Sequence, residues 1–198
     1  MQTLAKQVLQ YAAELPEGTP LVAKGLLHLG NRAAVDQVLS RLVRRGALLR
    51  ASRGIYVLPV KTRFGNRAPS TAKMVEGLAN HCGETIVPHG AAAANALGLT
   101  KQVPMRAIYL TSGPSRRLKL GAQTVELRHA AIWQLIFPGR AAGEVVRALA
   151  WLGPEKSVDA VRKLRAKLPS AELNEIASAR PRLPTWMAQE ISTLVMHA

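Results

Sequence analysis

Apolar residues recur at helical spacing three times within the first 45 residues. The first set predicts a helix of about three turns and comprises Leu4, Val8, Leu9, Ala12 and Leu15. The second predicts a short helix ending at Gly30 and comprises Leu21, Leu26, Leu27 and Leu29. The third follows the i, i+3, i+4, i+7, i+8 pattern, stops at Gly46, and comprises Val35, Val38, Leu39, Leu42 and Val43. Together they predict a compact helix-turn-helix core.

After the third helix the pattern changes from helical to extended. Residues 47–50 lead into a tight turn formed by Ser52, Arg53 and Gly54. Residues 55–58 (IYVL) then supply a return strand of β-branched and aromatic character. A two-stranded ribbon is marginally stable alone, so we expect it to pack on the helices. The whole segment predicts a winged helix-turn-helix, with the hairpin as its wing.

The rest of the chain mixes short strands with helices. Residues 61–70 lack periodicity, which predicts a linker or arm between a domain at 1–60 and a second at 71–198. The second domain is expected to hold strands at 85–87 and 106–111, a helix at 91–97, and a hairpin at 117–120 and 124–129. Helices follow at 143–152, 157–168, 171–178 and 184–196, broken by Pro154, Pro169 and Pro181. The expected fold class is α+β: a winged helix-turn-helix, then a mixed α/β domain with a helical C-terminal region.

The charge of the chain favours an acidic partner. Its 198 residues include 27 Lys and Arg against 12 Asp and Glu, a formal net charge of +15. This imbalance favours nucleic acid first and an anionic membrane second. The net charge is +8 over residues 1–68, +5 over 69–150 and +2 over 151–198. Basic charge is therefore densest where the helix-hairpin pattern lies.

The third predicted helix separates its polar residues from its apolar stripe, as a DNA-recognition helix does. Its N-terminal end should approach base edges, where Arg can contact guanine and Asn or Gln can contact adenine. The base-reading candidates are Asn31, Arg32, Ala33, Asp36 and Gln37. The candidates for the DNA backbone and for the wing are Lys24, Arg41, Arg44, Arg45, Arg50, Ser52 and Arg53. The alternative for all of them is a solvated basic face.

Metal and catalytic chemistry find little support. Cys82 is the only cysteine, which excludes an internal disulfide, and with His81 and His89 it lacks a fourth zinc ligand. The sequence contains no Gly-rich phosphate loop of the Walker type, no Gly-x-Ser-x-Gly and no His-Glu-x-x-His. The acids of residues 69–150 are too few for a clustered magnesium site; they are Glu76, Glu84, Glu126 and Glu144. We therefore expect no catalytic residue, no metal and no cofactor.

The sequence also bears on location. The N-terminal stretch MQTLAKQVLQYAAELPEG carries charges through its apolar pattern, unlike a signal peptide. No segment approaches 18 uninterrupted apolar residues. A single cysteine suits a reducing compartment. We expect a cytoplasmic protein with no membrane partner.

Two strings of the sequence resemble a known family. They are RGIYVLPVKTRFGNRAPS at 53–70 and VPHGAAAANALGLTKQVPMRAIYLTSGPSRRLKLGAQTVELRHA at 87–130. The chain resembles the AbiEi-like antitoxins, in the branch described as DUF6088 or AbiEi-type transcriptional regulators. The resemblance covers roughly residues 5–135, is most specific over Gly90–Lys119, and finds nothing diagnostic after about residue 140. It implies an N-terminal domain that represses its own operon and a second domain that antagonises a nucleotidyltransferase-like toxin.

Three functions follow for testing. The first is an autoregulating repressor that binds inverted repeats of double-stranded operator DNA through residues 21–58, as a monomer or a homodimer. The second is a protein-interaction module that captures an acidic toxin or a nucleic-acid-bound partner without sequence-specific DNA contact. Its second-domain basic surface comprises Arg116, Arg117 and Lys119, whose arginines could meet phosphate or an acidic toxin surface. For those arginines, the alternative is an ordinary solvated turn. The third is a DNA-acting enzyme that would depend on Glu126.

Overall fold

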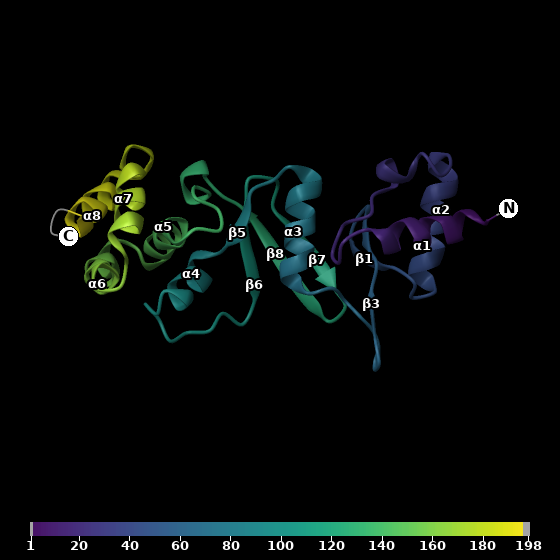
Figure 1. The fold of residues 1–198 in the computed structure, drawn as a ribbon, viewed down its shortest axis with the longest axis horizontal. Coiled ribbons are helices and arrows are strands. Elements are labelled where there is room, and N and C mark those ends of the chain that lie inside the picture. The colour runs from purple at the N-terminus through teal and green to yellow at the C-terminus, as the bar shows by residue number, and fades with distance from the viewer. Residues whose placement is uncertain (1, 196–198) are drawn as a thin grey trace. The chain divides into compact units, whose positions relative to one another are not determined.

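The computed structural model describes residues 2–195 of the chain (Figure 1). Helices and short strands alternate along it, which confirms the predicted α+β class. Contacts divide the chain into two compact units. Unit 1 contains the described residues up to Glu84 together with Arg116–Glu126; unit 2 contains Thr85–Ser115 together with the described residues from Leu127 onward. A compact unit is not by itself a domain, so the predicted domain boundary at residues 61–70 stays a prediction.

Unit 1 begins with α1 (Leu4–Glu14), η1 (Ala23–Leu26) and α2 (Arg32–Arg44). The helices predicted from the first and third apolar sets are confirmed. The second set predicts a short helix, and the structure has one, η1, but it is a four-residue 3₁₀-helix that ends at Leu26, before the predicted end at Gly30. Gly25 within it disfavours helix, and the segment is too short to propagate one.

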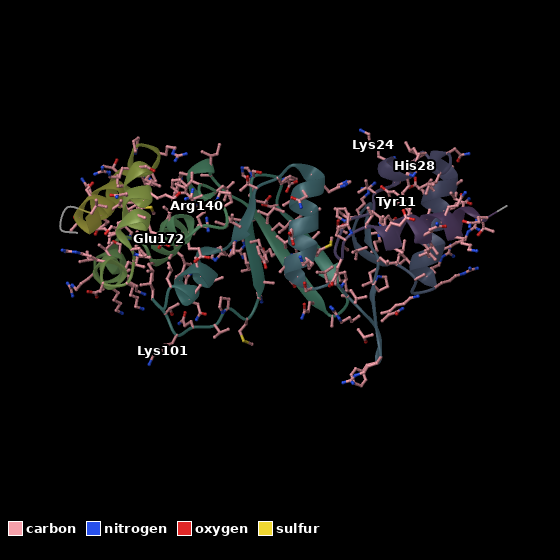
Figure 2. All side chains as sticks on the ribbon, viewed as in Figure 1. Tyr11, Lys24, His28, Lys101, Arg140 and Glu172 are labelled. Carbon is pink, nitrogen blue, oxygen red and sulfur yellow. The ribbon has the colours of Figure 1, made fainter. Side chains whose placement is uncertain are left out.

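The apolar stripes of α1 and α2 pack into one core. Val8, Val35 and Leu39 are fully buried, as the helical spacing predicts. Leu21, Leu26, Leu42 and Leu48 complete the centre of this cluster. At its edge, the ring of Tyr11 meets His28 edge to face, with ring centroids 5.2 Å apart (Figure 2). The packing leaves the opposite face of α2 exposed.

A hairpin follows α2 and is fastened to the helices. It consists of β1 (Leu49–Ser52) and β2 (Ile55–Val57), which pair antiparallel across a turn at Arg53 and Gly54. The backbone N–H of Leu21 donates to the Tyr56 carbonyl at 2.8 Å, and the Tyr56 N–H donates back to Leu21 at 3.0 Å. This bridge joins the hairpin to the segment before η1, as expected for a ribbon that is marginal alone.

A second hairpin occupies most of the predicted linker. It consists of β3 (Val60–Thr62) and β4 (Gly65–Arg67), paired antiparallel with Thr62 opposite Gly65. Residues 61–70, predicted from their lack of periodicity to be a linker or arm, thus include most of two short paired strands. Three-residue strands are too short for alternation to show, while Gly65, at φ 108°, permits the tight turn.

After the second hairpin comes α3 (Thr71–Cys82), and its cap is a serine. The Ser70 hydroxyl oxygen accepts the Lys73 N–H at 3.3 Å. Met74, Val75 and Leu78 form the buried side of the helix.

Four strands form a sheet with the order β5-β6-β8-β7. Its members are β5 (Ile86–Pro88), β6 (Ala107–Thr111), β7 (Arg116–Leu120) and β8 (Gln123–His129). Alternation buries one face of β7 and β8 where they run through the core, at Leu118, Leu120, Val125 and Leu127. The predicted hairpin is confirmed, except that β7 begins at Arg116, one residue earlier than the sequence pattern predicts.

Helices make up most of unit 2: α4 (Gly90–Ala96), α5 (Ala141–Leu152), α6 (Pro154–Arg165), α7 (Ser170–Ser178) and α8 (Thr185–Val195). The short 3₁₀-helices η2 (Ile132–Gln134) and η3 (Arg180–Arg182) lie before α5 and α8. The four predicted C-terminal helices are confirmed, although residue 196, the predicted end of the last, lies outside the described residues. Pro154 begins α6 rather than preceding it, because the first helical position needs no N–H.

The helices of unit 2 share one large apolar core. Its fully buried members include Val145, Val146, Leu149, Ile176, Met187 and Ile191. Helices α4 and α5 approach especially closely, since a Cβ added to Gly90 would lie 2.3 Å from the Arg147 carbonyl oxygen. Among the described helices, none has the length and apolar character needed to cross a bilayer.

Candidate nucleic-acid interface

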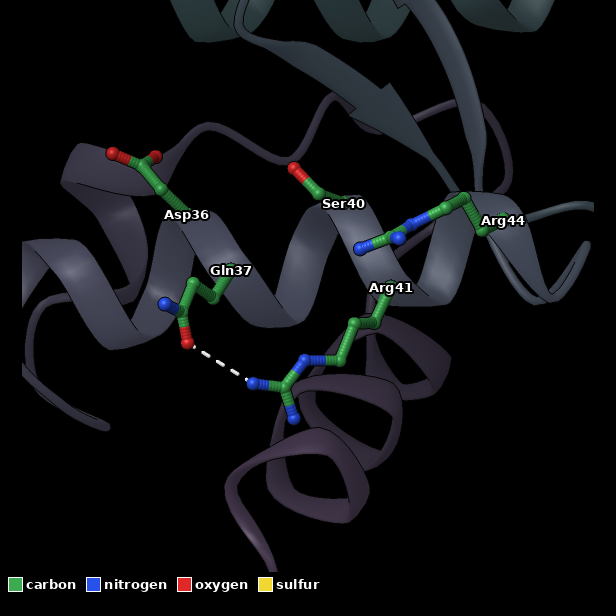
Figure 3. A pocket seen from close by; sticks show the side chains of 5 residues that line it. All are labelled: Asp36, Gln37, Ser40, Arg41 and Arg44. Carbon is green, nitrogen blue, oxygen red and sulfur yellow. Dashed lines mark hydrogen bonds between the residues drawn. The ribbon is translucent and has the colours of Figure 1, made fainter.

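The exposed face of α2 gathers most of the predicted site. Asp36, Gln37, Ser40, Arg41 and Arg44 line an open depression of about 410 Å³ along the helix (Figure 3). The buried stripe fixes this arrangement, because Val35, Val38, Leu39 and Leu42 must face the core. The polar residues between them are then forced outward.

Two pairs along α2 hold its candidate base-reading side chains. Arg32 Nε lies 2.8 Å from Asp36 Oδ2, and both side chains are at least half exposed. Arg41 Nη2 donates to Gln37 Oε1 at 3.0 Å (Figure 3). Exposed pairs of this spacing contribute about 0.3–0.5 kcal/mol, so a ligand can replace them at little cost. The pairs order the side chains without sequestering them.

Asn31 and Ala33 stand apart from these pairs. The Asn31 side-chain oxygen accepts the Ala34 N–H at 2.9 Å and so caps α2. Contact with adenine would need that oxygen as well as the amide N–H groups. Helix capping therefore explains Asn31, while Ala33 is an exposed residue of the first turn.

The backbone-contact candidates extend from η1 to the tip of the first hairpin. Lys24 projects from η1 into solvent (Figure 2). Arg41, Arg44 and Arg45 line a second open depression of about 370 Å³ at the C-terminal end of α2, where the helix dipole also favours cations. Arg50 and Arg53 are exposed on β1 and its turn, whereas Ser52 is half-buried.

These arginines are mostly free of acidic neighbours. Within residues 2–195, no carboxylate lies within ion-pair distance of Arg44, Arg45, Arg50 or Arg53. Uncompensated guanidinium groups at a surface attract anions and can form paired hydrogen bonds with phosphate. This end of unit 1 can therefore bind a polyanion.

The three basic residues of β7 do not form one surface. Arg116 Nη2 lies 2.7 Å from Glu84 Oε2, and both side chains are largely buried. Arg117 and Lys119 are exposed on the opposite face of the strand. A strand alternates its side chains, so the one-residue offset assigns Arg116 to internal structure.

The residues weighed as metal ligands have other roles or positions. His89 Nδ1 accepts the Ala91 N–H at 3.2 Å, which places this histidine at the start of α4 as its N-cap. His81 and Cys82 lie exposed at the end of α3. Across the described part of the chain, no three His, Cys, Asp or Glu residues cluster closely enough for a metal.

Sequence reasoning misses two basic residues of the second hairpin, Lys61 and Arg63, which are exposed. The signal is present in the string VLPVKTRFGNR, which is basic and has no acid. It is obscured because the segment has no periodicity and therefore favours a linker.

Fold and surface together define a mixed α+β protein with an exposed basic helix and hairpin. The model of the family of unknown function DUF6088 matches residues 7–175, and the chain belongs to that family. This match extends past the region of sequence resemblance, through α5 and α6 and into α7.

The other comparisons concern curated proteins and solved structures. No curated protein matches the chain significantly. The crystal structure of the RV2827C protein from Mycobacterium tuberculosis is similar, with a TM-score of 0.52 and 16% sequence identity over 99% of this chain and 77% of that chain. At this identity the likeness concerns the fold alone.

Proposed function

We propose that this chain is a sequence-specific DNA-binding repressor that acts through residues 21–58. The observation that supports this most is the exposed basic face of α2, which has arginines without acidic partners at one end and exchangeable polar pairs at the other. Anion attraction gives affinity for any duplex, whereas exchangeable donors near the helix N-terminus give sequence preference.

In the proposed complex, α2 enters the major groove, whose width of about 12 Å admits a helix. Arg32 and Gln37 exchange their intrahelical partners for base edges. Arg41, Arg44 and Arg45 bind phosphates, and the β1–β2 hairpin acts as the wing, with Arg50 and Arg53 at the DNA backbone. η1 serves in place of a full second helix and presents Lys24 to the adjoining phosphates.

Selection from a library of random duplexes about three helical turns long tests this proposal. We expect the wild type to enrich one motif, and its symmetry reports whether one half-site or an inverted repeat is bound. Arg32→Ala should relax the preference at one position by about 1–3 kcal/mol. Arg44→Ala should weaken all duplexes alike and lower the salt slope by about one.

Lys101→Ala is the matched control. It removes one exposed positive charge from unit 2 (Figure 2) and should leave both the preference and the salt slope unchanged. Equal wild-type affinity for the enriched motif and for unselected duplex would remove the repressor function.

We further propose that the repressor is the cytoplasmic antitoxin of an AbiE-type operon, with a nucleotidyltransferase-like toxin as partner. The support is the sequence resemblance over 53–70 and 87–130; membership of a family of unknown function adds none. If the adjacent gene encodes a nucleotidyltransferase-like protein, its expression alone should arrest growth, and co-expression of this chain should restore it. Continued arrest would leave a regulator without antitoxin activity.

A second candidate function is capture of an acidic protein by the exposed face of β7. Arg117 and Lys119 lie two residues apart there and can meet carboxylates of a partner. Arg117→Ala together with Lys119→Ala should then abolish neutralisation of the toxin while DNA affinity is retained. Loss of DNA affinity with neutralisation intact would assign this face to DNA instead.

A further inference from the structure

The tip of the β3–β4 hairpin exposes a large aromatic side chain in a rigid turn. Phe64 is 87% exposed, and all residues from 61 to 67 are exposed. The Thr62 hydroxyl donates to the Gly65 carbonyl at 2.8 Å and its oxygen accepts the Phe64 N–H at 3.2 Å. The turn therefore holds Phe64 at the apex of the hairpin, where burial of its side chain against a partner would be favourable.

The surroundings of Phe64 are basic. The Arg63 guanidinium stacks over the Phe64 ring, 4.7 Å from its centroid. Lys61 lies on β3, two residues before Arg63, and the hairpin has no Asp or Glu. At the root, Arg67 Nη1 donates to the Ala68 carbonyl and lies 3.7 Å from Glu17 Oε1. The root is thus held by the fold, while the tip presents the Phe64 ring and the Arg63 guanidinium to solvent.

The hairpin is continuous with the basic end of α2. A depression of about 300 Å³ joins them, with Arg45 on one side and Lys61 and Asn66 on the other. Arg45 also lines the arginine-rich depression at the end of α2. A phosphate backbone bound along α2 would meet the root of the hairpin next.

We propose that the β3–β4 hairpin is a second DNA-binding element that inserts Phe64 into the minor groove and bends the duplex. This inference rests on the proposed DNA-binding function. Strands of three residues reach about 10 Å, enough for a groove about 7.5 Å deep. Lys61 and Arg63 bind the flanking phosphates, and the Phe64 ring wedges between two base pairs and partly unstacks them. A lipid surface suits the tip less, because stable anchoring needs more apolar area than one phenyl ring supplies.

The test uses the full chain and the duplex motif enriched by the wild type. Donor and acceptor dyes at the duplex ends report bending by energy transfer, and 2-aminopurine placed at successive positions reports unstacking. We expect the wild type to bend the duplex and to raise 2-aminopurine fluorescence at one step. Phe64→Ala should lose both signals and about tenfold in affinity, as removal of one base-aromatic contact predicts. Phe64→Trp should keep both signals.

Ile132→Ala is the matched control, because Ile132 in unit 2 is 82% exposed and should affect neither signal. If Phe64→Ala binds and bends the motif like the wild type, the hairpin inference is overturned and the repressor function stands. If the wild type prefers no duplex, the hairpin inference and the proposed repressor function fail together. A lipid-binding role would be supported instead by two results together. The wild type, but not Phe64→Ala, would sediment with phosphatidylserine vesicles, and the two proteins would bend the duplex equally.

Discussion

Arg44 of α2 and Arg147 of α5 are the same amino acid in opposite surroundings. Arg44 is exposed, whereas Arg147 is 1% exposed inside unit 2. Arg147 Nη1 donates to the Ile136 carbonyl at 3.4 Å, whereas Arg147 Nε and Nη2 have no hydrogen-bond partner among the described residues. Burial lowers the pKa of the Arg147 guanidinium, while the Glu144 carboxylate acts in the opposite direction. One arginine can reach a phosphate and the other cannot.

Net charge therefore overstates the surface that is available to a polyanion. Both Arg147 and the ion-paired Arg116 count toward the +15 charge, yet neither belongs to the exposed basic face. The α2 arginines contribute fully because the helix stripe turns them outward. Location, more than number, makes unit 1 the better candidate for DNA.

The largest expected effect lies on the packed side of this comparison. In Gly90→Ala the new Cβ would lie 2.3 Å from the Arg147 carbonyl oxygen and 2.6 Å from Trp151 Cβ. Forcing α4 and α5 apart should lower the free energy of unfolding by about 3 kcal/mol. Denaturant unfolding followed by tryptophan fluorescence measures it, because Trp133, Trp151 and Trp186 all belong to unit 2.

Gly25→Ala is the control for that substitution. The nearest atom to its added Cβ is a Val22 methyl carbon at 3.8 Å, an ordinary contact. We expect the free energy of unfolding to rise by up to about 1 kcal/mol, because the unfolded chain has lower entropy. Denaturant unfolding monitored by circular dichroism measures the change. Equal stability of Gly90→Ala and the wild type would show that α4 and α5 can separate freely.

A smaller effect of opposite sign is expected at Arg147. Arg147→Met replaces a buried cation with unpartnered N–H groups by an apolar side chain of similar length. It should raise the free energy of unfolding, measured by denaturant titration, by about 1 kcal/mol, since buried charges are costly when poorly satisfied. Arg44→Met, on the exposed side, should stay within about 0.5 kcal/mol of the wild type. Destabilisation by Arg147→Met would show that its guanidinium is well bonded in solution.

The smallest effect concerns the pair at the start of α2. A double-mutant cycle of Arg32→Ala and Asp36→Ala should give a coupling of about 0.3–0.5 kcal/mol in unfolding free energy, falling as salt rises. A coupling above about 1 kcal/mol would mean that Arg32 is not readily released to a base.

The sequence predicts the long helices better than it predicts the β3–β4 hairpin. Helices α1, α2 and α5 have apolar spacing over three turns, which determines both their extent and their buried face. The β3–β4 hairpin escapes prediction because its strands are short and its Arg63-Phe64 turn has no common turn residue before Gly65. The length of η1 is overestimated because Leu26, Leu27 and Leu29 fit a longer helix, whereas Gly25 disfavours one.

For the candidate site, the sequence likewise predicts which residues are exposed but not which side chains pair. The apolar stripe of α2 is enough to place Arg41 and Arg44 on the exposed face. The stripe cannot give the Gln37–Arg41 hydrogen bond, because side-chain pairing depends on rotamers. Burial of Arg147 has a sequence signal, since apolar residues surround it in VVRALAWL, but tertiary packing decides whether such a residue is covered.

The close approach at Gly90 also bears on how relatives of this chain are classified. Gly90 opens the string Gly90–Lys119, which carries the most specific resemblance, and its missing side chain is required by the contact between α4 and α5. A signature that selects glycine at this position therefore selects for the way two helices meet. Chains grouped by it can share their architecture and still differ in the molecules they recognise.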